Sequence, residues 1–451
     1  MTPTETPTMH LAAIPPARSH PVTDFGAVSD GTTDNANAIQ AAIDACAATG
    51  GGRVVIPAGV FMSGKIFLRS RIELHLEMGA VLLCSPDNAA LRDEKLGPGL
   101  RNAFLCAKDA EDIAVTGLGV IDGNGRAYIK ETLPHIHVMH ERRPVTLYFG
   151  GCRRVTMTGV TVRDAAAWTL WFCGCDDLLV HGIRIDNDLR LPNNDGIDLD
   201  RCRNVRISDC HIDTGDDAIV IKAMREFEHY GACENIVVTG CTLKSTSSAL
   251  CIGCEIAAPV RRVIFDSCTI SSSHRGLSIN HSFESDIEDV LFSNITIETR
   301  LFNDLWWGRG EPIYVKALPW TETDRVGRIR NVRFRDIRAR SENGILVWGE
   351  SPDRIDGIEF ENVDLTLTKW SKHPGGKLDL RPCPGGDNGY ASGVIDHPTL
   401  PLIVRNARDV SFRGCRVRVA PGVAPKEAGV LRIENVEGFR FEGLTLDSVP
   451  A

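Results

Sequence analysis

The sequence has few aromatic residues, no excess of positive charge and no long apolar run. Phe, Trp and Tyr make up 6% of the 451 residues, and the formal net charge is −9. A surface for nucleic acid or for an anionic membrane needs clustered Lys and Arg, so neither partner is expected. No run of about 18 apolar residues occurs, so a membrane span is not expected either.

The beginning of the chain also lacks the features of an export signal. Residues 1–19 are rich in Pro and Thr and have neither a cationic start nor an apolar centre. We therefore expect a cytoplasmic protein, or a secreted or periplasmic one if a native signal peptide has been removed. Residues 1–20 are predicted to form a flexible tail, and residues 21–451 a single domain.

Fifteen cysteines occur in the chain, and many occupy apolar repeat positions, as Cys210 and Cys241 do. In the reducing compartment that the missing signal predicts, such residues are small buried hydrophobic side chains rather than disulfide partners. Cys251 and Cys254 have the C-x-x-C spacing of metal or redox sites. No second pair with zinc-ligand spacing follows, so we expect no metal there.

A short phrase recurs along the chain: a polar pair, followed by apolar and polar residues in alternation. Successive copies are 23, 27, 31, 27 and 27 residues apart between Val155 and Val290. The apolar positions that define the copies are Ile113, Val155, Leu178, Val205, Ile236, Val263, Val290, Val332, Ile358, Val410 and Phe439. Alternation with period two is typical of strands with one buried face, and a period of 20 to 30 residues is typical of a solenoid. The sequence therefore predicts an all-β protein, a parallel β-helix.

Two intervals exceed this period and predict loops that project from the stack. The copies at Val290 and Val332 are 42 residues apart, and those at Ile358 and Val410 are 52 residues apart. Insertions of this kind commonly build the binding face of a solenoid.

A helix is predicted before the repeats. Residues 33–46 have helical apolar spacing, with Asp34 or Asn35 as the candidate N-cap. We expect this helix to cap the first coil, whose apolar face would otherwise be exposed.

Three aspartates occupy two successive turns of the predicted coils. Asp195 ends the motif Asn193-Asn194-Asp195, and Asp216 follows it by 21 residues, close to one coil, in the motif Gly215-Asp216-Asp217. Asn, Asp and Gly also build ordinary turns, so neither motif alone carries much weight. Because adjacent coils stack at roughly 4.8 Å, we expect the three carboxylates to lie side by side. Carboxylates that flank a glycosidic bond are the catalytic pair of glycoside hydrolases.

These motifs resemble those of the polygalacturonase family, glycoside hydrolase family 28. The likeness extends over residues 21–445 and includes the opening residues 22–31 and the turn at residues 121–125. The family's Asn-Thr-Asp motif corresponds to residues 193–195, with Asn in the middle place, and its Gly-Asp-Asp motif is intact at 215–217. The resemblance implies a right-handed parallel β-helix and hydrolysis with inversion at the anomeric carbon.

The resemblance further implies that Asp216 is the general acid and that Asp195 and Asp217 orient and deprotonate the attacking water. The chemistry agrees, because carboxylates a few ångströms apart do not all ionise easily and one stays protonated near neutral pH. Inverting enzymes separate the acid from the base by about 6.5 to 9.5 Å, and we expect neighbouring coils to provide this spacing.

Two motifs of the family are not matched. Its Gly-His-Gly falls on residues 247–249, so Ser248 replaces the histidine that supports catalysis. Its Arg-Ile-Lys falls on Ser278-Ile279-Asn280, which removes the two cations that grip galacturonate beyond the cleavage point. Arg and Lys make the charge-assisted hydrogen bonds best suited to a uronate. We therefore expect the substrate to have changed.

Ten residues are predicted to bind the substrate. Lys222 lies on the strand phrase after Asp217 and is expected either to hold a substrate anion or to neutralise the acidic cluster. Trp306 and Trp307 lie in a Gly-flanked loop, where two adjacent aromatic rings are hard to bury and favour stacking on a sugar. The remaining candidates are polar residues near the motifs above or in the insertions: Asn193, Glu255, His274, Arg275, His281, Arg309 and Arg381.

The sequence thus supports the hypothesis of an inverting glycoside hydrolase that needs no cofactor or metal. Its expected substrate is a pectic or related plant oligo- or polysaccharide of galacturonate or rhamnogalacturonan type, and the long insertions favour exo action. A β-helix polysaccharide lyase is one alternative, but it would need calcium ligands around an arginine base, whereas Asn193 and Lys222 accompany this acidic cluster. A non-catalytic carbohydrate-binding β-helix is the other, and it would have no reason to align three carboxylates. The oligomeric state cannot be read from the sequence.

Overall fold

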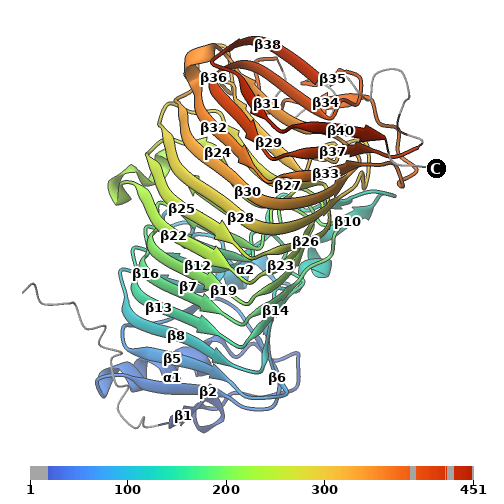
Figure 1. Cartoon of the computed structure of the whole chain (residues 1–451). Helices are drawn as coiled ribbons and strands as arrows, with labels where there is room; N and C mark the ends of the chain where they lie inside the picture. Colours follow the sequence, from blue (N-terminus) through green and yellow to red (C-terminus); the bar gives the residue numbers. More distant parts are fainter. Residues whose placement is uncertain (1–18, 386–392, 422, 424–430, 449–451) are drawn as a thin grey trace, which may run out of the picture.

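The chain forms a column of stacked coils. The structure, a computed structural model, describes residues 19–385, 393–421, 423 and 431–448. Strands run in parallel from β1 at one end of the column to β38 at the other (Figure 1), and 36 of the strands in the described part form one continuous sheet. The coils wind in the right-handed sense that parallel crossover connections favour. The predicted right-handed parallel β-helix is therefore confirmed.

Three faces make up the column, and the long strands β28, β30 and β36 each bend from one face to the next. The first face contains β1 (Ser19–Pro21), β2 (Gly52–Ile56), β5 (Ile72–Leu76), β8 (Glu111–Gly117), β13 (Arg153–Thr158), β16 (Asp176–His181), β19 (Arg203–Ser208), β22 (Cys233–Thr239), β25 (Val260–Asp266), β28 (Ile287–Thr299), β30 (Ile329–Ser341), β32 (Ile355–Glu361), β36 (Leu402–Arg413) and β39 (Arg440–Glu442). The second contains β3 (Gly59–Ser63), β6 (Ala80–Cys84), β9 (Val120–Asp122), β14 (Thr161–Arg163), β17 (Arg184–Asp186), β20 (His211–Thr214), β23 (Thr242–Ser245), β26 (Thr269–Ser273), β33 (Asp364–Leu367), β37 (Arg416–Val419) and β40 (Thr445–Ser448).

The third face carries the candidate site. It contains β4 (Ile66–Phe67), β7 (Ala103–Lys108), β12 (Val145–Gly150), β15 (Leu170–Cys173), β18 (Ile197–Asp200), β21 (Ile219–Ala223), β24 (Ser248–Ile256), β27 (Arg275–His281), β29 (Ile313–Ala317), β31 (Ile345–Gly349) and β38 (Leu431–Glu437). Two antiparallel pairs lie outside the column: β10 (Ile129–Thr132) with β11 (His137–Met139), and β34 (Lys377–Asp379) with β35 (Val394–Asp396). The short helices are η1 (Val22–Phe25), α2 (Asn88–Leu91), η2 (Gly125–Tyr128), η3 (Arg225–Tyr230) and η4 (Pro352–Arg354).

The repeat positions found in the sequence lie in register on the first face. Val155 pairs with Ile113 on one side and Leu178 on the other, and the ladder continues from Leu178 through the next seven copies to Val410. The residue before each of these apolar positions bends the backbone near the start of its strand. Asn204 and Asn235 have φ of 55° and 60° there, a left-handed conformation that Asn tolerates. This is why a polar residue recurs in the phrase.

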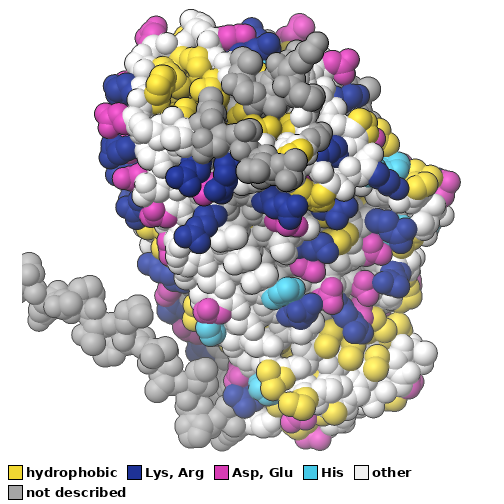
Figure 2. Space-filling view, turned by 45° about the vertical axis from the view of Figure 1, so that its right-hand side comes forward, with side chains coloured by type: hydrophobic (Ala, Val, Ile, Leu, Met, Phe, Trp, Pro, Cys, Tyr) yellow, Lys and Arg dark blue, Asp and Glu magenta, His cyan; other side chains and the backbone are white. Residues whose placement is uncertain are grey.

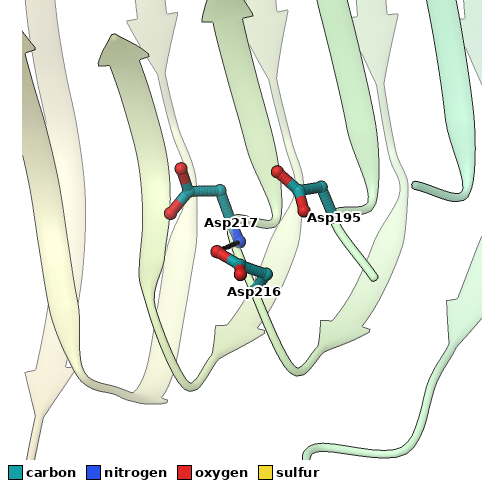
Figure 3. A group of neighbouring side chains, drawn as sticks. All are labelled: Asp195, Asp216 and Asp217. Atoms are coloured by element: carbon teal, nitrogen blue, oxygen red, sulfur yellow. Dashed lines mark hydrogen bonds between the residues drawn. The ribbon is translucent and has the colours of Figure 1, made fainter. Parts of the chain in front are cut away.

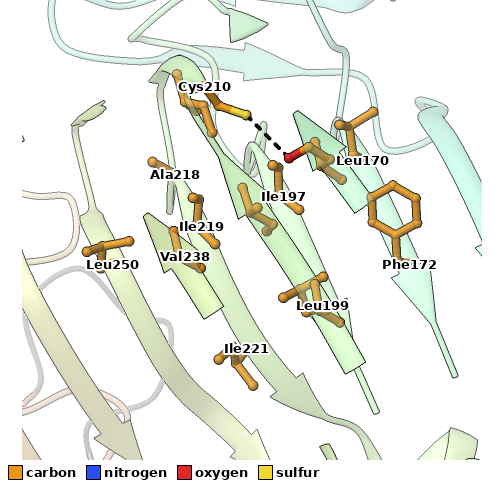
Figure 4. Packing of buried hydrophobic residues seen from close by; sticks show 14 of the residues in the cluster. Leu170, Phe172, Ile197, Leu199, Cys210, Ala218, Ile219, Ile221, Val238 and Leu250 are labelled. Atoms are coloured by element: carbon orange, nitrogen blue, oxygen red, sulfur yellow. Dashed lines mark hydrogen bonds between the residues drawn. The ribbon is translucent and has the colours of Figure 1, made fainter. Parts of the chain in front are cut away.

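Side chains inside the column stack in rows, one from each coil. Leu170, Ile197, Ile219 and Leu250 form such a row and are fully buried (Figure 4). A second row consists of phenylalanines, with adjacent ring centroids 4.8, 5.0, 5.0 and 4.3 Å apart: Phe265, Phe292, Phe334, Phe360 and Phe412. These rows form the continuous core that a solenoid needs.

The predicted capping helix is α1 (Ala36–Ala48), and it packs against the first coil with Ile39 and Ile43 buried. Asp34 Oδ1 accepts the amide of Ala36 at 2.9 Å. Asn35 holds the N-cap position, but its side chain bonds to neighbouring backbone instead. The predicted tail boundary at residue 20 falls inside β1, which starts at Ser19; residues 1–18 lie outside the described residues.

The cysteines are mostly buried, and charges of both signs are mixed on the surface. All fifteen cysteines are free, and all but Cys254 are buried. Basic and acidic side chains are interspersed over the face shown in Figure 2, and many pair across coils, as Arg418 does with Asp364 at 2.7 Å. Within the described ranges, no helix has the length and apolarity to cross a membrane.

The outer side of the third face is covered, unlike that of the first. Every residue of β15, β18, β21, β27 and β29 is buried, whereas β16 and β19 alternate between buried and exposed. Leu100 and Phe227 cover the N-terminal coils, where they pack on the outward side chains of β12 and β15. Leu378 and Leu380 cover the C-terminal coils over β29 and β31. We call these two pairs the N-terminal wall and the C-terminal wall.

Candidate active site

The three predicted aspartates meet at the corner where the second face turns into the third. Asp195 precedes β18, and Asp216 and Asp217 precede β21, the strand paired with it (Figure 3). The neighbouring glycine of each motif is needed for close packing. A Cβ on Gly196 would lie 2.4 Å from the carbonyl oxygen of Ala218, and one on Gly215 would lie 2.3 Å from that of Leu191.

One carboxylate oxygen from each of Asp195, Asp216 and Asp217 lies within 4.8 Å of the others. The expected separation of about 6.5 to 9.5 Å is therefore not found between these oxygens. The reason is geometric, because Asp216 and Asp217 are adjacent in sequence and Asp195 lies on the coil stacked directly beside them. Inversion thus rests on the family resemblance rather than on this distance.

Asp216 and Asp217 have different hydrogen-bond partners. Asp216 accepts the backbone amides of Asp217 at 3.0 Å and Asn193 at 3.2 Å. Asp217 Oδ1 accepts the Ser247 hydroxyl at 2.8 Å and the Ser248 amide at 2.9 Å. The altered Gly-His-Gly motif therefore supplies two hydrogen-bond donors that hold the Asp217 side chain in position.

Burial and mutual repulsion keep protons on this cluster. Burial, reinforced by the charge of Asp217, raises the pKa of Asp216 to about 7. Burial also raises the pKa of Asp195 well above its ordinary value, and the charges of Asp198 and Asp216 add to the effect. The cluster therefore retains a proton at mildly acidic to neutral pH, which a general acid requires.

Asp198 and Asp200 on β18 extend the acidic cluster, and the sequence analysis did not assign them a role. Neither oxygen of Asp198 has a hydrogen-bond partner within the described part of the chain, although the residue is fully buried. Burial raises the pKa of Asp198 well above its usual range and that of Asp200 to about 7. Alternation along β18 was a signal that these side chains share the outer side with the site.

Lys222 balances part of this charge. Its Nζ lies 3.6 Å from Glu255 and 4.9 Å from the centre of the Trp168 ring. Burial lowers its pKa, but the charges of Glu255, Asp195 and Asp198 outweigh burial and raise the pKa well above 10.5. Lys222 therefore stays charged and neutralises the acidic cluster, one of the two roles predicted for it. It also lines the pocket described next.

A pocket of about 210 Å³ lies over the three aspartates. Five of the predicted substrate-binding residues line it: Asn193, Lys222, Glu255, Arg275 and Trp307. Asn193 has φ of 56° and accepts a hydrogen bond from Arg143 at 2.8 Å.

The other five predicted binding residues are not among the residues that line the pocket. His274 and His281 are fully buried. Arg309 donates to the carbonyls of Trp306 and Gly308, and Arg381 makes two bonds of 2.8 Å to Asp379. Trp306 packs edge-on against Trp307, with ring centroids 6.1 Å apart. The prediction of substrate contact is corrected for these five. His274 and His281 are buried directly before β27 and at its end, whereas partners within the insertions hold Trp306, Arg309 and Arg381.

Sequence reasoning missed several residues of the site. Trp168 and Trp320 line the pocket as Trp307 does. Trp320 lies in the same long interval between repeats as Trp307, and this position could have marked it as a candidate pocket residue. Arg143 lies close enough to Asp195 and Asp216 for its charge to interact with theirs. No motif marks Arg143, because it reaches Asn193 from 50 positions away.

Comparisons with known proteins agree with this fold and site. The profile of the family described as Glycosyl hydrolases family 28 matches residues 46–374. A "Probable polygalacturonase" from Vitis vinifera is 28% identical over 267 residues, which cover 55% of this chain and 54% of that protein. An "Exo-poly-alpha-D-galacturonosidase" from Dickeya chrysanthemi is 28% identical over 249 residues, 44% of this chain and 41% of that protein. The chain thus spans about half the length of these relatives.

Solved structures resemble the whole column. A hyperthermoactive exopolygalacturonase from Thermotoga maritima is 21% identical, with a TM-score of 0.64, over 96% of this chain and 92% of that one. A family 28 exopolygalacturonase from Yersinia enterocolitica is 18% identical, with a TM-score of 0.72, over 93% and 78%. At these identities the likeness concerns the fold alone.

The fold and the aspartate site define a β-helical carbohydrate-active protein. Together with the match to most of its length, they place this chain in glycosyl hydrolases family 28. It is a divergent member, because the family's Gly-His-Gly and Arg-Ile-Lys motifs are both replaced.

Proposed function

We propose that this protein is an exo-acting glycoside hydrolase that cleaves pectic or related plant oligosaccharides with inversion. The observation that carries the proposal is the cluster of Asp195, Asp216 and Asp217 in a pocket, where Asp216 has a pKa of about 7. Such a carboxylic acid can protonate a leaving oxygen, while a neighbouring carboxylate activates water. Family membership supports the same chemistry.

In this mechanism, protonated Asp216 donates its proton to the glycosidic oxygen as the bond from the anomeric carbon to that oxygen breaks. Water attacks the anomeric carbon from the opposite side of the ring. Asp217, held by Ser247 and Ser248, accepts the water proton, and Asp195 orients the water. The product sugar then carries the opposite anomeric configuration, and proton exchange with solvent restores the starting state.

Exo action is supported by the two walls. A polymer that is cut internally must extend over the third face in the direction of the column axis, past both sides of the pocket. The N-terminal wall (Leu100 and Phe227) and the C-terminal wall (Leu378 and Leu380) cover that face on both sides of the pocket. A chain end can enter such a pocket, whereas we expect the two walls to obstruct the middle of a polymer.

The test is the hydrolysis of a panel of pectic oligosaccharides by the wild type and by Asp216→Asn. We expect release of small units from the chain end, and a loss of about 10²- to 10⁴-fold in kcat for the variant, the usual contribution of general acid catalysis. An unchanged far-ultraviolet circular dichroism spectrum would show that the variant is folded. Near wild-type turnover by a folded variant, or internal cuts in long polymers, would contradict the proposal.

One observation favours a lyase as the second candidate. The three carboxylates lie close enough to share a cation, and Arg143 lies near them. However, the Arg143 guanidinium donates to the carbonyls of Ala166 and Pro192 and to Asn193. An arginine that is charged and occupied in this way is a poor base, so we favour hydrolysis.

A further inference from the structure

Asn280 presents a buried hydrogen-bond acceptor to the pocket. It stands on β27 where the family has the lysine of Arg-Ile-Lys, lines the pocket and is 8% exposed. Its Nδ2 donates to the carbonyl oxygen of Arg381 at 3.3 Å, which fixes the orientation of the amide. Oδ1 then has no hydrogen-bond partner among the described residues. A buried acceptor without a donor is costly, so a ligand that donates to it gains binding free energy.

No neighbouring cation is available to replace the lost pair. Lys316 lies directly beside Asn280 on the next coil. Its ammonium is fully buried and donates to the Ser282 hydroxyl at 3.0 Å, to the Leu380 carbonyl at 3.4 Å and to the Pro382 carbonyl. All three of its hydrogen-bonding positions are therefore used by the protein.

The two cations that line the pocket are also paired. Arg275 lies 3.4 Å from Glu311 and 3.5 Å from Asp379, and its guanidinium stacks on the Tyr314 ring at 3.8 Å. Lys222 pairs with Glu255. A uronate beside Asn280 would meet an acceptor and paired cations, together with the charge of the aspartate cluster.

We propose that the subsite beyond the cleavage point takes a neutral sugar, one of whose hydroxyl groups donates to Asn280 Oδ1, and that it rejects a uronate. This inference rests on the proposed function and specifies its substrate. Trp307 and Trp320 line the same pocket and offer ring faces to the apolar side of a sugar. The side chains that replace the family's cations thus match a hydroxyl donor rather than a carboxylate.

A purely structural role for Asn280 makes a different prediction. If the residue only fastened the insertion through Arg381, its loss would lower activity on every substrate alike and lower the melting temperature. If Asn280 instead accepts a hydrogen bond from a sugar hydroxyl, the loss of activity depends on which sugar occupies the subsite.

The experiment compares kcat/KM for three oligosaccharides: one of galacturonate and rhamnose, trigalacturonate, and methyl-esterified trigalacturonate. We expect the wild type to prefer the rhamnose-containing substrate and to accept the neutral ester better than the free acid. Asn280→Ala should lose roughly 5- to 100-fold on the rhamnose-containing substrate, the cost of an unmade buried hydrogen bond. Its loss on trigalacturonate should be smaller, so that the ratio of the two kcat/KM values falls in the variant. Ser271→Ala, an exposed serine on β26, serves as the control.

A preference of the wild type for trigalacturonate, or an equal loss of Asn280→Ala on all substrates, would overturn the inference. If the wild type hydrolysed none of them, the proposed function would fail instead. Binding to Asp216→Asn, measured by calorimetry, then decides the subsite. Tighter binding of the rhamnose-containing oligosaccharide would sustain the inference, and tighter binding of trigalacturonate would overturn it.

Discussion

Two neighbours that replace a family motif hold Asp217, the proposed base, in position. The Ser247 hydroxyl and the Ser248 amide both donate to Oδ1. A hydrogen bond to a charged group contributes about 1.5 to 3 kcal/mol, so the hydroxyl alone should matter measurably. Ser247 and Ser248 therefore hold the Asp217 carboxylate, although the family's histidine is absent.

We predict that Ser247→Ala lowers kcat by about 10- to 100-fold, because an ionised carboxylate loses one of its two donors. Asp217→Asn should cost at least as much, since it removes the base itself. Steady-state kinetics on the best oligosaccharide would measure both. A Ser247→Ala enzyme as active as the Ser271→Ala control would show that this hydroxyl does not support the base.

The raised pKa of Asp216 also makes the stability of the folded protein depend on pH. Its pKa in the folded protein, about 7, lies above the ordinary value of 3.8. Between these two values the folded state holds a proton that the unfolded state releases. The free energy of unfolding therefore falls as pH rises through this window. Asp200, with the same raised value, acts in the same direction.

Asp216→Asn should consequently become more stable than the wild type as pH rises. We expect similar melting temperatures near pH 4 and a higher one for the variant above pH 7, measured by scanning calorimetry. Asp364→Asn, which alters an exposed ion pair, should show no such trend. A wild type that gains stability over Asp216→Asn between pH 5 and pH 8 would refute the raised pKa.

At the residue scale, local motifs were predictable and distant partners were not. Asp195, Asp216 and Asp217 sit in turns whose Asn and Gly neighbours mark them in the sequence. Arg381 was interpreted as a substrate contact because it is charged and lies in an insertion. Its bonds to Asp379 and to the carbonyl of Trp306, 75 positions away, give it a structural role instead.

At the scale of elements, the insertions are held to the third face by buried charge. Asp379 on β34 is fully buried, bonds to Arg381 and to the Gly308 amide at 2.9 Å, and lies 3.5 Å from Arg275. These bonds tie the two insertions and β27 together. Although burial raises the pKa of Asp379, the arginines around it hold that pKa well below its usual range.

We predict that Asp379→Asn destabilises the protein by about 3 to 5 kcal/mol, because it leaves buried arginines without a countercharge. The pocket residues Trp307 and Pro382 lie in the insertions that Asp379 connects, so KM should rise more than kcat falls. Chemical denaturation and steady-state kinetics would measure these effects. Asp364→Asn is the matched control and should change stability by no more than about 1 kcal/mol. Equal effects of the two substitutions would contradict a role for the buried cluster.

The elements of the column were predictable because their residues obey a local rule, whereas the course of the insertions was not. A polar residue in the left-handed conformation and alternating apolar residues specify each strand. The positions and lengths of both insertions could be read from the spacing of the repeats. That they would fold back over β29 and β31 follows from contacts such as Leu380 with Tyr314, which no local pattern encodes. Residues 386 and 387, part of the second insertion noted in the sequence, lie outside the described residues.

At the scale of the whole molecule, the column brings a catalytic corner and two walls onto one face. The coils position Asp195 beside Asp216 because their strands are paired, and the two walls cover the same face on both sides of the pocket. This arrangement agrees with the proposed action on chain ends. We propose that the enzyme hydrolyses its substrate with inversion and without a metal ion.

Time-resolved proton NMR of oligosaccharide cleavage in the presence of EDTA tests that claim most directly. We expect full activity, saturated products, and a first-formed anomer opposite in configuration to the bond that was cleaved. Initial retention of configuration would contradict the assignment of Asp217 and Asp195 as a water-activating pair. Signals of an unsaturated uronide, or activity that returns only when calcium is added, would show that the protein is a lyase.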